Sequence, residues 1–179
     1  MNDLRERIPY IPYTMKRLAA LSAACMLLLS GCGSRQQMEL SCEKPVLAMR
    51  SAANFGDEES YLSCWLPQEK AHFRLAEDRQ AGFLDNVFDR GDHESRLRVR
   101  IRESVEADEE YIRDTLEPEA RKRYGCPLTF TAAQRLSVDF RVQDNMDILS
   151  DSRDIYVVKY CGVWYIYGEV IDSFKFARS

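Results

Sequence analysis

The chain has 179 residues, of which 45% are hydrophobic and 30% charged, and these globular proportions exclude collagen, disordered tails and multi-span membrane proteins. At about 100–200 residues per domain, this length accommodates one ordinary domain. Lys and Arg number 25 against 29 Asp and Glu, so the formal charge is −4 and the basic excess typical of nucleic-acid-binding proteins is missing. We therefore expect no nucleic-acid partner.

The first part of the chain has the order of parts found in a bacterial export signal. Lys16 and Arg17 follow Met15 as a cationic stretch, and residues 18–29 form an uncharged apolar run. A helix of about 12 residues would be about 18 Å long, too short for a hydrocarbon core of about 30 Å. Residues 1–31 are therefore predicted to be a cleaved signal peptide, with Met15 as an alternative start of translation.

The apolar run ends in Leu29-Ser30-Gly31-Cys32, which resembles the lipobox of bacterial lipoproteins. In that family the cysteine is diacylated and becomes the first residue of the mature protein, so the resemblance implies that Cys32 is the lipid attachment site. Two acyl chains give stable membrane anchoring where one gives only marginal binding. The implied location is extracytoplasmic, on the cell membrane or the outer membrane depending on the host. The alternative is a buried helix with Cys32 as a core thiol.

The lipidated cysteine and a short polar linker are expected to occupy residues 32–42, followed by a single domain over residues 43–179. Four of the 25 Lys and Arg residues and two of the 29 Asp and Glu residues precede Gly33, so the remainder has a formal charge of −6. An acidic body of this kind suits solubility and does not favour a basic membrane clamp.

The first half of the domain shows helical patterns. Pro45 suits the first turn of a helix, and Gly56 suits its end. Asp57 is expected to cap a second helix over residues 58–66, and residues 68–88 are predicted to be mostly helical.

A strand pattern follows, because apolar Leu97, Val99 and Ile101 alternate with arginines, as in a half-buried strand. Residues 107–123 are predicted to form a helix, since their first turn is acidic and their last turn basic. Three further strands are expected at residues 135–143, 154–160 and 163–170, with a two-residue turn, Cys161-Gly162, between the last two.

This order of elements predicts an α+β fold in which N-terminal helices pack on a curved antiparallel sheet of about four strands. Gly56-Asp57 followed by Tyr61-Leu62, together with Gly162-Val163-Trp164-Tyr165 near the end, resembles the small cystatin-like or nuclear-transport-factor-2-like domains of bacterial lipoproteins. Those domains open with such a helix pair and close on a Gly-x-Trp-Tyr hairpin, and the similarity spans most of residues 43–171. The resemblance implies a conical sheet. It implies no reaction, because the superfamily includes both enzymes and binding modules.

The four cysteines after the lipobox form an even set in an exported domain. They could form one or two disulfides, with three possible connectivities, or remain free thiols. They are Cys42, Cys64, Cys126 and Cys161. None of their spacings is Cys-x2-Cys, so neither a metal site nor a dithiol redox motif is predicted. Both histidines, His72 and His93, fall in polar stretches, and we predict no catalytic residue and no cofactor.

Four arginines of the first strand share one face at intervals of about 6.6–7 Å, a geometry that suits an anionic ligand. They are Arg96, Arg98, Arg100 and Arg102. As a binding site, this arginine ladder would hold an anionic envelope component or the acidic face of a partner protein. The alternative is a solvated strand face whose like charges prevent edge pairing and in which Asp139 pairs across the sheet.

Aromatic residues are concentrated in the closing hairpin, where Trp164, Tyr165 and Tyr167 could line a pocket or a dimer face, or could simply pack in the core. We expect a non-enzymatic cell-envelope lipoprotein that binds a partner protein or a small ligand at the extracytoplasmic face of the membrane. The alternatives are a pocket enzyme of the same fold and a structural module that forms a homodimer through its sheet.

Overall fold

A computed structural model of the chain describes residues 41–76, 82–89, 95–144 and 147–174. These residues all belong to the second of the two units into which the chain divides, residues 41–179. The expected signal peptide, Cys32 and most of the linker lie outside the described residues. None of the described helices is both long enough and apolar enough to span a membrane.

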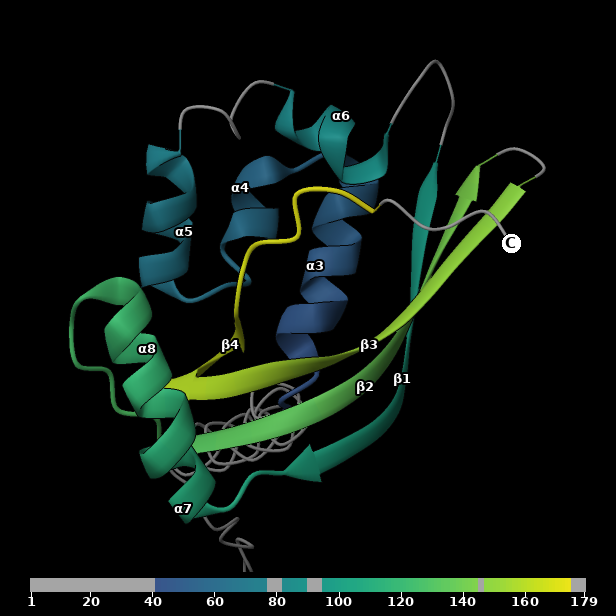
Figure 1. The fold of residues 1–179 in the computed structure, drawn as a ribbon. Helices are drawn as coiled ribbons and strands as arrows, with labels where there is room; N and C mark the ends of the chain where they lie inside the picture. Colours follow the sequence, from purple (N-terminus) through teal and green to yellow (C-terminus); the bar gives the residue numbers. More distant parts are fainter. Residues whose placement is uncertain (1–40, 77–81, 90–94, 145–146, 175–179) are drawn as a thin grey trace, which may run out of the picture. The chain divides into compact units, whose positions relative to one another are not determined.

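Over the described residues the fold is α+β, with four helices ahead of a four-stranded antiparallel sheet in the order β1-β2-β3-β4 (Figure 1). The prediction of N-terminal helices on a sheet of about four strands is confirmed. In chain order the elements are α3 (Lys44–Phe55), α4 (Glu58–Leu62), α5 (Pro67–Leu75), α6 (Phe83–Phe88), β1 (Arg96–Glu106), α7 (Glu109–Tyr111), the π-helical turn η2 (Ile112–Leu116), α8 (Glu117–Tyr124), β2 (Ala132–Asp144), β3 (Asp147–Tyr160) and β4 (Val163–Tyr167).

The first two helices begin and end where their local residues favour it. α3 carries a proline in its first turn and stops at Gly56, whose φ of 70° lies in the left-handed region that glycine adopts readily. The carboxylate of Asp57 accepts a hydrogen bond from the Ser60 N–H at 3.0 Å and caps α4. The expected helix starts are therefore confirmed.

The second helix ends four residues earlier than predicted, at Leu62. The next residues pair with the edge strand β4 instead. The Ile166 N–H donates to the Cys64 carbonyl at 2.8 Å, and the Leu66 N–H donates to the Ile166 carbonyl at 3.3 Å. Backbone hydrogen bonds to a distant strand thus replace those of the predicted helix, and the prediction of helix up to residue 66 was wrong.

One face of the sheet carries the main core, against which α3, α4, α5 and α6 pack. Leu136, Val138, Phe140 and Val142 of β2 are all buried, in one core cluster with aromatic side chains of the helices. The largest fully buried side chains of this core are Trp65, Tyr61, Phe73, Phe83, Phe140, Met49, Leu62, Leu97 and Leu136.

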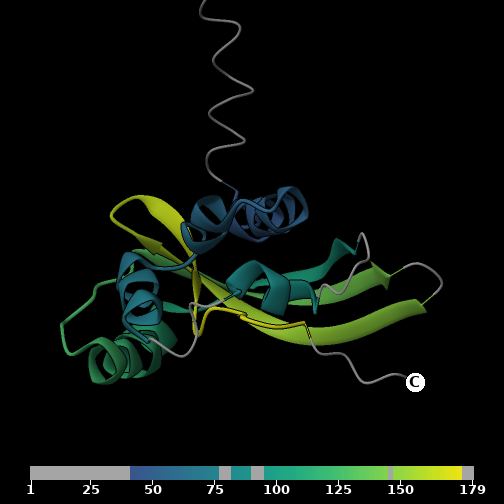
Figure 2. The same ribbon diagram turned by 90° about the horizontal axis from the view of Figure 1, so that it is seen from above.

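A second, smaller core lies on the opposite face of the sheet, under the helical segment α7–η2–α8. In Figure 2, α8 lies at the end of the sheet that carries the β3–β4 turn. Ile112, Leu116 and Ala120 of this segment pack with Val158 of β3. The π-helical turn ends two residues before Pro118, which lacks the N–H that would close the ordinary helical hydrogen bond.

The β3–β4 hairpin closes through two residues, as predicted. Cys161 has φ 50° and Gly162 has φ 82°, and positive φ at both central positions is the mark of a type I′ turn. This turn type matches the twist of the flanking strands. A cysteine therefore occupies a left-handed position at which asparagine or glycine is more common.

Candidate functional site

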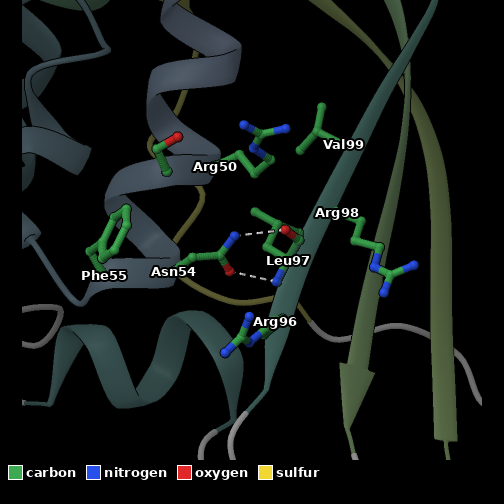
Figure 3. Close-up of a pocket in the computed structure, with 8 residues that line it drawn as sticks. Arg50, Asn54, Phe55, Arg96, Leu97, Arg98 and Val99 are labelled. Carbon is green, nitrogen blue, oxygen red and sulfur yellow. Dashed lines mark hydrogen bonds between the residues drawn. The ribbon is translucent and has the colours of Figure 1, made fainter.

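The arginine ladder lies on β1, which is an edge strand of the sheet. Leu97 is 1% exposed, while the side chains of the four ladder arginines are all exposed. The predicted alternation of one buried and one solvated face is therefore confirmed. The helices of the main core cover the buried face; Arg98 points away from α3, whereas the guanidinium of Arg96 lies on the α3 side of the strand (Figure 3).

The register of the sheet places further charged residues beside the ladder. Arg98 lies directly opposite Arg141 of β2, and Arg100 lies opposite Asp139. Like charges directly opposite each other on a sheet are destabilising. We use the name basic face for the solvated cluster formed by Arg96, Arg98, Arg100 and Arg141; none of these four forms an ion pair with any other residue that the structure describes.

Arg102 differs from the other ladder arginines. The register between β1 and β2 shifts between Ile101 and Glu103, so Arg102 falls in a bulge. Its Nε lies 3.1 Å from Oδ1 of Asp139, which also accepts a hydrogen bond from the Ser152 hydroxyl at 2.5 Å. The expected pairing of the ladder with Asp139 is thus found at one arginine.

Charges are balanced on the next part of the same sheet face. Arg135 lies 3.1 Å from a carboxylate oxygen of Asp154, and the Ser137 hydroxyl donates to the other oxygen of that carboxylate at 2.7 Å. The unpaired positive charge is therefore concentrated near the β1 edge.

A groove of about 610 Å³ lies between α3 and β1 (Figure 3). The amide of Asn54 spans it and makes two hydrogen bonds with the backbone of Leu97, at 2.8 and 2.9 Å. Arg50 extends from α3 toward the strand, whereas Arg98 points away from the groove. Phe55 lines the groove and is 87% exposed. The eight lining residues include three arginines and no acidic residue.

A buried ion pair joins two helices on the other side of the molecule. Glu69 of α5 is 1% exposed, and both of its carboxylate oxygens accept from Arg123 of α8, at 2.8 and 2.9 Å. The hydrogen bond with Glu69 is the main cause that raises the pKa of Arg123 above its usual value. Burial, followed by the Glu69 charge, raises the pKa of Tyr124.

This ion pair was missed by sequence reasoning, because residues 54 positions apart give no local signal. The Glu69 carboxylate makes structural contacts: it accepts two hydrogen bonds from Arg123 in bidentate geometry and a further one from the Val170 N–H, at 3.4 Å. We therefore assign the pair to the docking of α8 onto α5.

The four cysteines of the domain are free thiols in different surroundings, and they are not brought together. The thiol of Cys42 donates to Gln134 at 2.7 Å, and that of Cys64 donates to the Ser60 carbonyl at 3.3 Å. Burial raises the pKa of Cys64 to about 12. Cys126 is half-buried and Cys161 is exposed.

Over the described ranges, no cluster of three or more His, Cys, Asp or Glu residues could hold a metal ion. His72 is exposed on α5, and His93 lies outside the described residues. The aromatic residues of β4 are split between the two faces of the sheet. Trp164 packs against the main core, while Tyr165 and Tyr167 contact the smaller core, where the Tyr167 hydroxyl donates to the Leu116 carbonyl at 3.4 Å.

A scan against protein-family models finds no match for this chain, and searches of curated proteins and of solved structures find none either. The structure itself establishes the fold at the level of α+β architecture. The lipobox and the cystatin-like resemblance stay predictions.

Proposed function

We propose that the protein is a non-enzymatic cell-envelope lipoprotein that holds a partner protein close to the membrane. In this proposal the anchor is a diacylated Cys32, and the partner docks through an acidic surface onto the basic face. The single observation that carries the proposal is the direct opposition of Arg98 and Arg141, flanked by Arg96 and Arg100, with no ion pair to any described residue.

Physical chemistry favours an anionic partner at this face. Opposed arginines repel each other, and a carboxylate placed between them would remove that repulsion. Guanidinium groups also bind carboxylates through two parallel hydrogen bonds, which sets orientation as well as affinity. In a chain whose formal charge is −4, a localised basic patch would orient an acidic partner during its approach.

The linker supports a role close to the membrane. Residues 33–40 of the linker are eight residues long, and a fully extended chain spans at most about 3.6 Å per residue, or about 29 Å in total. A domain on so short a linker would meet partners that are themselves in or near the membrane. The proposal therefore names a membrane-associated or surface-bound partner rather than a diffusing one.

Chemical cross-linking in intact cells tests the partner. We expect the full-length protein to be cross-linked to one or a few proteins, and we expect the double variant Arg98→Glu/Arg141→Glu to lose them. The double variant Arg121→Glu/Lys122→Glu, which reverses two charges on α8, is the matched control and should keep them. An unchanged set of cross-linked proteins in the Arg98→Glu/Arg141→Glu variant would contradict the proposal.

The anchor is tested separately by Cys32→Ala, with Cys42→Ala as the control. We expect Cys32→Ala to abolish incorporation of radiolabelled fatty acid and to move the protein out of the membrane fraction. Cys42→Ala should change neither. Continued labelling and membrane association of the Cys32→Ala variant would remove the anchor from the proposal.

A further inference from the structure

The outer edge of β1 offers backbone hydrogen-bonding groups next to the groove. Because both the N–H and the C=O of Leu97 bond to Asn54, both groups point away from β2 and toward α3. In an antiparallel pair such groups alternate, so those of Val99 and Ile101 also point away from β2. No described residue forms a hydrogen bond with the backbone groups of Val99 or Ile101 on that side.

The groove gives access to this edge. Its walls are α3 and β1; Asn54 closes the part next to Leu97, and the Arg50 side chain extends from α3 toward the part beside Val99 (Figure 3). A strand edge flanked by a helix is a setting in which extended peptides bind by adding a strand to a sheet. Main-chain hydrogen bonds then supply affinity, and alternate side chains supply specificity.

We infer that the groove binds an extended segment of a partner protein as a fifth, antiparallel strand beside β1, and that acidic and apolar residues alternate in this segment. The inference extends the proposed function, since it names the part of the partner that is recognised. In this inference the partner contacts the backbone edge of β1 as well as the arginines of the basic face.

The alternating pattern follows from the two sides of β1. Side chains of the added strand that lie beside Val99 would be on the same side of the sheet as Val99 and the buried Leu97 and would face α3, which suits apolar residues. Those beside Arg98 and Arg100 would project from the basic face, where each carboxylate would lie next to a guanidinium.

The same geometry disfavours a second copy of this chain as the occupant. Antiparallel pairing of two β1 edges through the outward backbone groups would place arginines of one ladder directly opposite arginines of the other. Repeated like-charge pairs of this kind prevent edge-to-edge association. An acidic segment from a different protein would avoid these like-charge pairs.

The test uses the full-length protein in a non-ionic detergent and a fluorescein-labelled probe peptide of sequence Val-Glu-Val-Glu-Val-Glu-Val, with binding followed by fluorescence anisotropy. We expect saturable binding of this peptide and at least tenfold weaker binding of the corresponding Val-Lys peptide. The double variant Arg98→Glu/Arg100→Glu should reverse this preference, and Arg121→Glu on α8 should leave it unchanged.

Backbone methylation of the peptide separates strand addition from simple charge attraction. In an antiparallel added strand the valine N–H groups point toward β1 and the glutamate N–H groups point away. N-methylation of the internal valines should therefore weaken binding at least tenfold, while N-methylation of the glutamates should change it by less than threefold.

The possible failures are distinguishable. Equal binding of the two methylated peptides would overturn strand addition and leave the basic face as the proposed docking surface. Strand addition would also be overturned if the acidic peptide did not bind at all. Normal peptide binding combined with unchanged cross-linking in the Arg98→Glu/Arg141→Glu variant would contradict the proposed function alone.

Discussion

Asn54 and Leu97 are 43 positions apart, yet the side-chain amide of Asn54 forms both hydrogen bonds that a neighbouring strand would form with Leu97, at 2.8 and 2.9 Å. An amide carries one acceptor and one donor group at the spacing of a peptide unit, so it can replace a strand at a single residue. This contact attaches α3 to the exposed edge of the sheet.

We expect Asn54→Ala to lower the free energy of unfolding by about 1–3 kcal/mol, because it leaves two backbone groups of Leu97 without partners. Asn54→Asp should be at least as destabilising, since a carboxylate keeps the acceptor but sets an oxygen against the Leu97 carbonyl. Urea unfolding followed by circular dichroism measures both. Wild-type stability of the Asp variant would show that the amide donor contributes nothing.

Removing one member of the Glu69–Arg123 pair should be severe, because Glu69 is 1% exposed and its charge would remain buried without a partner. We expect Arg123→Met to lower the free energy of unfolding by about 3–5 kcal/mol. The double variant Glu69→Met/Arg123→Met should lose clearly less than the sum of the two single variants.

An exposed ion pair between α5 and α4 provides the control. Arg74 of α5 pairs with Glu59, and both side chains are at least half exposed to solvent. Arg74→Ala should leave the unfolding midpoint unchanged, since solvated pairs contribute little. Equal losses from Arg74→Ala and Arg123→Met would argue against a special role for the buried pair.

The β3–β4 turn can be improved or damaged at adjacent positions. Cys161→Asn should raise the unfolding midpoint slightly, because asparagine tolerates a left-handed φ better than cysteine does. Gly162→Ala should lower stability by about 1 kcal/mol, through backbone strain alone, since a Cβ at this position would meet nothing within 4 Å. Thermal unfolding of the two variants should therefore shift in opposite directions, and shifts in the same direction would contradict the turn assignment.

The four thiols should react with iodoacetamide in the order of their exposure. The thiolate is the reactive form, and a pKa raised to about 12 leaves Cys64 almost fully protonated at pH 8. Peptide mass spectrometry should find Cys161 alkylated first and Cys64 unmodified until the protein is unfolded in urea. The reactivity of Cys64 should rise only as the pH approaches 12.

The same experiment decides between thiols and disulfides. If Cys161 reacts only after reduction, it is part of a disulfide in the exported protein, and the free-thiol arrangement does not apply there. Alkylation of Cys64 as fast as Cys161 in the folded protein would contradict the burial of Cys64.

Patterns within a few residues of each other were enough to predict most elements of the described fold. The period-two alternation around Leu97 predicted β1, and its buried and solvated faces are confirmed. Asp57 predicted the start of α4, and Cys161-Gly162 predicted the closing turn. Such signals are local because capping, turn formation and alternation depend on neighbouring backbone atoms.

Tertiary structure alone decided the rest. Only the sheet register brings Arg98 opposite Arg141, and only the approach of α3 to β1 lets Asn54 bond to Leu97. The pairing of residues 64–66 with β4 likewise overrode a helix that the local pattern favoured. Register and docking depend on contacts between residues far apart in the chain, and their free energies compete with local preferences that the sequence shows directly. The ladder arginines and their possible partner Asp139 could therefore be named from the sequence, but Arg141, Asn54 and the groove beside them could not.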